Sequence, residues 1–200
     1  CKHAEGNWLS NFQSAPPLGS LRIRNMAWWR SPAVPASSLL IGNQSLDARD
    51  WELSLMSLAG SRVIMLGDLR ELSEQDRRQA RKWATWLRKM QEKHNYMMFR
   101  RDLAGFGEPR DGDWDGWSRI NTETRSGGII GVFRQDGPDA TRTVLVNGLN
   151  PQSQYIVKKA PEGTVECELT GKELAEQGFK VTLNSRFDAG LFEIQMAEKP

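Results

Sequence analysis

The chain of 200 residues contains only two cysteines and two histidines. Cys1 and Cys167 are too far apart in the sequence to indicate a disulfide framework or a metal-binding motif. His3 and His94 fall in different segments, and no serine or cysteine stands in a nucleophile-elbow motif, which argues against a triad hydrolase. Gly127-Gly128 is not followed by the Lys-Ser/Thr of a phosphate-binding loop. We therefore expect no metal and no cofactor.

The sequence also lacks long apolar runs and a strong net charge. No stretch approaches the roughly 20 apolar residues of a membrane-spanning helix. The 27 Lys and Arg residues nearly balance the 25 Asp and Glu residues, so the net charge is only +2. Basic residues gather only over 77–89, which is typical of a solvated helix face, with a phosphate-binding face as the alternative. We expect no membrane span and no nucleic-acid partner.

What is present is the composition of a soluble globular protein, with 38% apolar and 26% charged residues. Over residues 1–95, apolar runs at 37–41 and 62–66 flank a helical pattern at 51–58, which is typical of an α/β protein. Ser73 begins a predicted helix of about 20 residues, since Asp76 follows it at capping-box spacing. We expect the buried stripe of this helix to comprise Ala80, Trp83, Ala84, Leu87 and Met90, with Trp83 and Trp86 as packing residues.

After residue 95 the pattern changes to short strands separated by turn residues. The predicted strands are 97–100, 114–120, 129–134, 143–146, 155–158, 164–169, 179–183 and 190–196. Their number and spacing predict an antiparallel β-sandwich over residues 96–200, in which 132–151 reads as a hairpin with a Gly-Pro turn. Thr170 and Glu173 form a capping box for one helical turn at 173–177. The segment 111–117 resembles a calcium loop but lacks its terminal Glu, so we assign its tryptophans to a strand.

Several short motifs now stand in one order: GDLRELS at 67–73, WDGW at 114–117, GVFRQ at 131–135 and LTGKEL at 169–174. Together they resemble the C-terminal part of α-galactosidase-like glycoside hydrolases, family 36 and its relatives, over residues 37–196. The resemblance implies a partial (β/α)8 barrel at 1–95, which belongs to the catalytic domain, followed by a C-terminal β-sandwich at 96–200.

On this resemblance, 39–45 would be the seventh barrel strand and 63–68 the eighth, while 6–8 and 25–30 would be the fifth and sixth. A barrel of this kind needs about 250 residues and eight strands to close. We therefore expect the chain to require upstream polypeptide or a partner subunit. The alternative is that residues 1–95 fold against the sandwich as a self-contained unit.

Retaining glycosidases need two carboxyl groups about 5–5.5 Å apart. The resemblance implies that the nucleophile Asp precedes Cys1 and that the acid/base Asp follows the sixth strand, where the matching residues 28–32 contain no carboxylate. Asp47 and Asp50 are the nearest acids, but Asp50 better suits the start of a helix. The catalytic residues thus stay unassigned, and we expect the fragment alone to be inactive.

Sugar rings offer an apolar face for stacking and hydroxyl rims for polar groups, so tryptophan with Asn, Gln, Asp or Arg at strand ends suits a pyranoside site. The candidate substrate-binding residues are Trp8, Trp28, Trp29, Arg30, Asn43, Gln44 and Asp68. Each has a structural alternative: packing for the tryptophans, an ion pair for Arg30 and a turn cap for Asp68.

We therefore expect the C-terminal portion of a retaining glycoside hydrolase that acts on α-galactoside-like glycans. A non-catalytic carbohydrate-binding module with Trp114 and Trp117 as an aromatic strip is the alternative, and a structural accessory domain is a third interpretation. The sequence does not identify the sugar or the compartment, although a periplasmic or secreted location would suit a glycan hydrolase.

Overall fold

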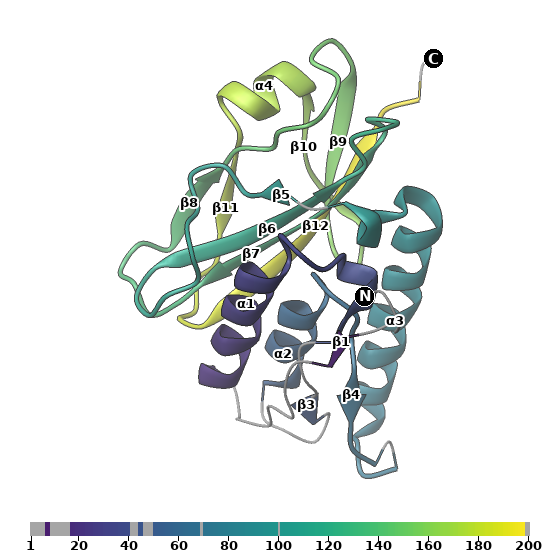
Figure 1. Ribbon diagram of the computed structural model, residues 1–200, viewed down its shortest axis with the longest axis vertical. Helices are drawn as coiled ribbons and strands as arrows, with labels where there is room; N and C mark the ends of the chain where they lie inside the picture. The colour runs from purple at the N-terminus through teal and green to yellow at the C-terminus, as the bar shows by residue number, and fades with distance from the viewer. Residues whose placement is uncertain are drawn as a thin grey trace.

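The structure is a computed structural model that describes residues 7–8, 17–40, 44–45, 50–68, 70–99 and 101–198, with the backbone alone at 7–8, 44–45 and 101–102. Figure 1 shows a layer of helices and short strands below a broad antiparallel sheet, with a smaller pair of strands on the far side of that sheet. Within the described ranges, no helix has the length and apolar character to cross a membrane.

The first layer alternates short strands with helices. In chain order its elements are β1 (Asn7–Trp8), α1 (Leu18–Arg30), a 3-10 turn (Ala36–Ser38), β2 (Leu39–Leu40), β3 (Gln44–Ser45), α2 (Trp51–Leu58), β4 (Met65–Leu66), α3 (Glu74–His94) and a second 3-10 turn (Tyr96–Met98). β1 pairs with β2 and β3 pairs with β4, and both pairs are parallel. Each helix thus follows a strand, as the α/β pattern predicts.

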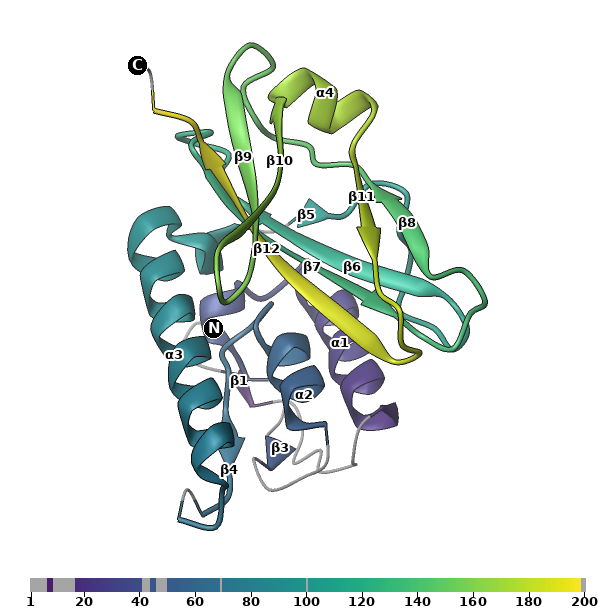
Figure 2. The same cartoon turned by 180° about the vertical axis from the view of Figure 1, so that it is seen from behind.

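The second part is an antiparallel β-sandwich, as predicted. Its strands are β5 (Arg101–Asp102), β6 (Trp114–Ile120), β7 (Gly127–Arg134), β8 (Thr141–Val144), β9 (Gln154–Lys159), β10 (Thr164–Thr170), β11 (Phe179–Thr182) and β12 (Asp188–Met196), with α4 (Gly171–Glu176) before β11. The large sheet has the order β10-β9-β12-β7-β6-β5, and β8 pairs with β11 in the small sheet. Figure 2 shows β8 and β11 crossing over the large sheet on the side away from α1, α2 and α3.

β7 lies at the centre of the fold and is buried along its whole length. Ile130 and Val132 face the small sheet and join its core. Ile129 and Phe133 face the helices and pack in a second core with α2 and α3. Because side chains alternate between the two faces of a strand, β7 contributes to both cores at once.

The predicted hairpin over 132–151 is wrong, because β7 and β8 belong to different sheets. Both edges of β7 are already occupied by β6 and β12, so the chain must leave the large sheet after Arg134. β8 instead pairs with β11, with Val144 opposite Phe179. The strand predicted at 97–100 is also wrong, since a 3-10 turn occupies Tyr96–Met98.

The predicted strand at 25–30 is wrong as well, because these residues form the second half of α1. Ser20, Ile23 and Arg24 are buried at helical spacing. The sequence does not show this pattern as an apolar stripe, because one of the buried positions is the charged Arg24. The strand was expected from the family resemblance, whereas the segment belongs to the helix that returns the chain from β1 to β2.

The predicted helix caps are confirmed. The Ser73 side chain accepts a hydrogen bond from the Asp76 backbone N–H at 3.0 Å, and α3 ends at Asn95 in a left-handed conformation. Thr170 and Glu173 form the expected capping box at the start of α4. The buried stripe of α3 differs from the prediction at Ala84, which is exposed, and at His94, which is buried; Trp83 and Trp86 are both buried, as expected of packing residues.

Candidate functional site

The direction of the short strands separates the predicted sugar-binding residues into two groups. α1 connects two parallel strands, so it runs back against them and ends near the start of β2. Figure 1 shows β3 and β4 pointing to the lower end of the molecule, where α1, α2 and α3 begin. Trp28, Trp29 and Arg30, at the end of α1, therefore do not lie at the carboxyl ends of strands.

The other predicted residues follow the strands more closely. Trp8 lies in β1 and Gln44 in β3, although their side chains fall outside the described residues, as does all of Asn43. Asp68 follows β4 by two residues. The carboxyl ends of β1 and β2 lie together, and so do those of β3 and β4. The backbone thus places Trp8 at the end of β1, Gln44 at the first residue of β3 and Asp68 just after β4.

The Asp68 carboxylate is held by its neighbour Arg70. Asp68 Oδ1 accepts from the Arg70 backbone N–H at 2.9 Å, and Oδ2 accepts from Arg70 Nη2 at 2.6 Å. The side-chain hydrogen bond from Arg70 is the main reason that the pKa of Asp68 is lowered. Asp68 therefore caps its turn and is ionised near neutral pH, which makes it an acceptor for hydroxyl groups and not a proton donor.

The end of α1 docks on the loop before β6. Glu108 Oε1 accepts from Trp29 Nε1 and from Asn25 Nδ2, both at 2.8 Å. These two hydrogen bonds, with that from Trp29 the larger cause, lower the pKa of Glu108. Trp29 is 64% exposed, Arg30 is exposed and Trp28 is half-buried. The structure therefore gives the Trp29 indole N–H a partner within the chain.

A buried ion pair, which the sequence reasoning missed, fixes the helices on the sheet. Arg24 of α1 donates to both oxygens of Asp115 in β6, at 2.7 and 2.9 Å, and to Ser57 of α2 at 2.8 Å. Gln135 also donates to Asp115, and the guanidinium lies 4.1 Å from the centre of the Phe133 ring. The one signal in the sequence was the carboxylate in WDGW, which stands between a tryptophan and a glycine in a predicted strand.

A large cavity, about 860 Å³, lies where α1, α2 and α3 begin and where β12 starts. Its lining comprises Pro17, Asp50, Trp51, Glu52, Leu53, Met56, Glu71, Leu72, Ser73, Asp76, Ser185, Arg186, Phe187, Asp188 and Ala189. Five carboxyl groups and one guanidinium therefore surround an apolar floor. Its volume is in the range of small-molecule sites. Sequence reasoning did not identify it, because its walls come from segments more than 100 residues apart.

Several cavity carboxylates already have partners. Trp51 Nε1 donates to Asp76 Oδ1 at 3.4 Å, and the Ser73 hydroxyl donates to Asp76 Oδ2 at 2.5 Å. Trp83 Nε1 donates to Glu52 Oε1 at 2.7 Å. Across the described part of the chain, no three His, Cys, Asp or Glu side chains gather closely enough to hold a metal ion.

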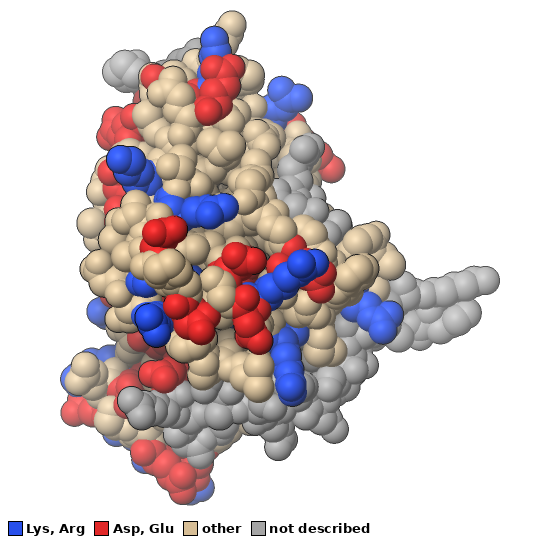
Figure 3. Space-filling model, turned by 90° about the vertical axis from the view of Figure 1, so that its left-hand side faces the viewer, with Lys and Arg blue, Asp and Glu red and all other residues tan. Residues whose placement is uncertain are grey.

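The surface beside the cavity carries charges of both signs. Figure 3 views the side of the molecule where α1 and the tips of β6 and β7 lie, and Lys and Arg alternate there with Asp and Glu. Such a face produces no extended field of one sign.

The aromatic strip proposed for a carbohydrate-binding module is not on the surface. Trp114 is 8% exposed, packs in the sandwich core and donates from Nε1 to the Asp139 carbonyl. Trp117 is half-buried, and its ring fills the space above Gly60 and Gly131. Neither ring is presented as a flat exposed platform, so this argument for a binding module fails.

No family model matches the sequence, and no curated protein matches it either. Solved structures do match the fold. A variant of the family 36 α-galactosidase AgaA from Geobacillus stearothermophilus in complex with raffinose is 14% identical, with a TM-score of 0.73, over 89% of this chain and 24% of that one. Another AgaA variant, in complex with stachyose, is 14% identical with a TM-score of 0.71 over the same shares.

The α-galactosidase of Lactobacillus brevis is 15% identical, with a TM-score of 0.71, over 92% of this chain and 25% of that one. The chain thus has the fold of the C-terminal domain of family 36 α-galactosidases. It spans about a quarter of the length of these structures.

Proposed function

We propose that the chain is the C-terminal portion of a retaining, α-galactosidase-like glycoside hydrolase that acts on α-galactoside-like glycans. Residues 1–95 would supply the last strands of a (β/α)8 barrel, and 96–200 its C-terminal sandwich. The observation that carries this proposal is the fold match over 89% of the chain, a share larger than the sandwich alone. Upstream polypeptide would supply the remaining strands.

The strand order indicates where the catalytic carboxyl groups would lie. If β4 is the eighth barrel strand and β2 with β3 the seventh, then β1 is the sixth, in place of the segment 25–30. The acid/base of the resembled family would then fall within 9–16, whose sequence LSNFQSAP contains no Asp or Glu. We therefore propose that both catalytic carboxyl groups lie outside this chain and that the chain alone is inactive.

The residues at the strand ends would line part of the sugar site. Asp68 is a fixed, ionised acceptor, and Trp8, Asn43 and Gln44 have side chains suited to ring stacking and to hydroxyl groups. Trp28, Trp29 and Arg30 lie at the opposite end of the layer, so we leave them out of this site. In the natural-length polypeptide, Asp68→Asn should raise KM for raffinose several-fold, while Asp111→Asn in an exposed turn of the sandwich should not.

The function is tested on the polypeptide from its natural source. Its intact mass and N-terminal sequence should reveal a chain several times longer that continues upstream of Cys1. That polypeptide should hydrolyse raffinose, whereas residues 1–200 alone should not. α-Galactosyl fluoride serves as a second substrate, because its leaving group needs no general acid, a group that contributes about 10²- to 10⁴-fold; it would reveal a polypeptide in which only that acid is missing. A mature chain that begins at Cys1, or a longer one inert toward both substrates, would refute the proposal.

A further inference from the structure

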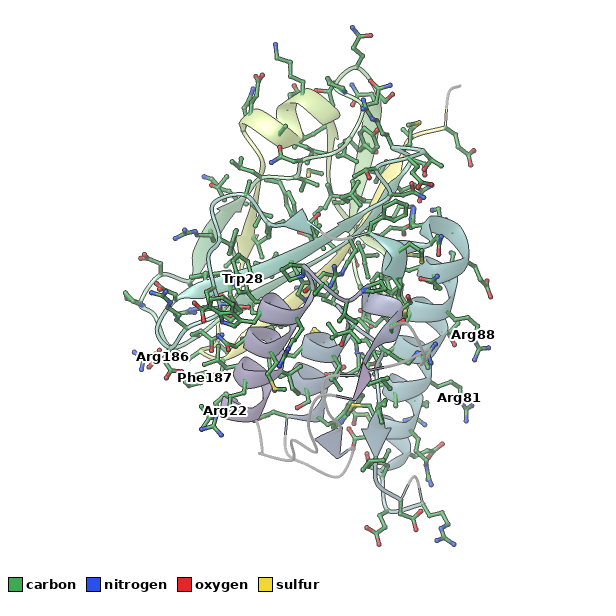
Figure 4. All side chains as sticks on the ribbon, viewed as in Figure 1. Arg22, Trp28, Arg81, Arg88, Arg186 and Phe187 are labelled. Carbon is green, nitrogen blue, oxygen red and sulfur yellow. The ribbon has the colours of Figure 1, made fainter. Side chains whose placement is uncertain are left out.

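Phe187 stands out at the rim of the large cavity. Its side chain is 40% exposed, and its backbone has a φ of 55°, a left-handed conformation that bulky residues rarely adopt. It directly precedes β12, and the next residues, Asp188 and Ala189, form part of the cavity wall. Figure 4 shows Phe187 and Arg186 on the outer side of the molecule, at the level of α1.

The loop that carries Phe187 is held rigidly by a buried arginine. Arg134, only 5% exposed, donates to the carbonyls of Leu183 and Asn184 at 2.7 and 3.1 Å, and from its other terminal nitrogen to Gly137 at 2.9 Å. The Phe187 backbone N–H donates to the Gln135 carbonyl at 3.2 Å. The ring is thus displayed on a pre-organised loop, which lowers the entropy cost of binding a ligand against it.

Two charged side chains at the cavity have no partner within the described part of the chain. Arg186 and Glu71 both line the cavity, and neither side chain forms a hydrogen bond or ion pair with a described residue. Glu71 can accept from hydroxyl groups and Arg186 can donate to ring and hydroxyl oxygens. The excess of carboxylates disfavours phosphorylated, sulfated or nucleic-acid ligands.

From the open cavity, the fixed aromatic ring and these unpaired donors and acceptors, we propose a second sugar-binding site. Its ligand is a neutral oligosaccharide, whose pyranose face stacks on Phe187 while Glu71 and Arg186 contact its hydroxyl groups. Only the class of ligand rests on the proposed function. The cavity lies at the same end of the helical layer as the strand ends assigned to the substrate, but Asp68 does not line it, so it would hold a more distant part of a glycan or a neighbouring chain.

The test measures binding of raffinose and maltotriose to residues 1–200 by saturation-transfer NMR and calorimetry. The informative variant is Phe187→Gly, because glycine adopts the left-handed conformation without strain, so the fold is retained while the ring is lost. We expect at least a tenfold weaker affinity. Phe187→Trp should restore the affinity, and Val165→Ala, which removes a 51% exposed side chain on β10, should leave it unchanged.

Two outcomes would overturn the inference. One is absence of binding to either sugar, and the other is equal binding by the wild type and Phe187→Gly. If neither sugar binds, binding of oligolysine would show that the acidic lining serves a basic peptide instead. These outcomes are independent of the proposed function, which is decided by hydrolysis in the longer polypeptide. Raffinose hydrolysis there, with no sugar bound to residues 1–200, would refute the second site alone.

Discussion

Asp115→Asn is the substitution that most directly probes how the helices are held on the sheet. It keeps the shape of the side chain and removes the negative charge opposite Arg24. Both residues are buried, with Arg24 4% exposed and Asp115 1% exposed. An unpaired guanidinium would then remain buried against Phe133. Breaking a buried pair in this way costs about 3–5 kcal/mol. That is a large part of the roughly 5–15 kcal/mol by which a typical domain is stable.

The assay is urea unfolding of residues 1–200, followed by tryptophan fluorescence. With a slope of about 2 kcal/mol per molar urea, a loss of 3 kcal/mol lowers the midpoint by about 1.5 M. Arg78→Ala is the matched control, because it breaks a 2.8 Å pair with Glu74 whose side chains are 63% and 77% exposed. Exposed pairs of this kind contribute about 0.5 kcal/mol or less.

The apolar double variant Arg24→Met with Asp115→Leu should recover part of the loss, since no buried charge is left without a partner. A midpoint for Asp115→Asn within 0.5 M of the wild type, or about 1 kcal/mol at that slope, would refute the reasoning. It would mean that the ion pair is solvated and that the helices are held by apolar packing alone.

Two further predictions concern the sheet itself. Burial opposes the charge of Glu193, but hydrogen bonds from His94 and Lys93 outweigh it and lower the pKa from 4.5 to about 2. The stabilisation is therefore present above pH 4.5 and is lost as the pH falls toward 2, so urea midpoints should fall over this range in the wild type and much less in Glu193→Gln. Gly131→Ala would place a Cβ 2.5 Å from the Trp117 ring, so it should lower the free energy of unfolding by about 1–3 kcal/mol, whereas Gly107→Ala, with open space around it, should not. Equal midpoints for the two glycine variants would contradict the packing of Trp117.

Local sequence patterns predicted the elements whose burial and ends depend on neighbouring residues. The strand at 114–120 and the helix at 51–58 have the predicted bounds, because turn residues flank the strand and the helix has apolar residues at helical spacing. α1 was missed because its core position is Arg24, which is buried only through Asp115, 91 residues away in the sequence. The hairpin error has the same origin, since the partners of β7 are fixed by pairing across the whole chain.

The site shows the same limit. Residue types at apparent strand ends predicted the position of Asp68 after a strand, because its turn depends on neighbouring residues alone. The large cavity could not be predicted, because it unites the starts of three helices with the loop before β12. The conformation of Phe187 depends on carbonyl contacts of Arg134, and no short motif records such contacts.

The two-sided burial of β7 also determines how the protein can come apart. Ile130 and Val132 stabilise the sandwich while Ile129 and Phe133 stabilise the helical layer, so the loss of either layer exposes one face of the same strand. The boundary near residue 95 therefore separates two patterns of chain topology but not two cooperative units. Unfolding should proceed as a single transition, and the amide protons of β7 should be among the last to exchange with solvent.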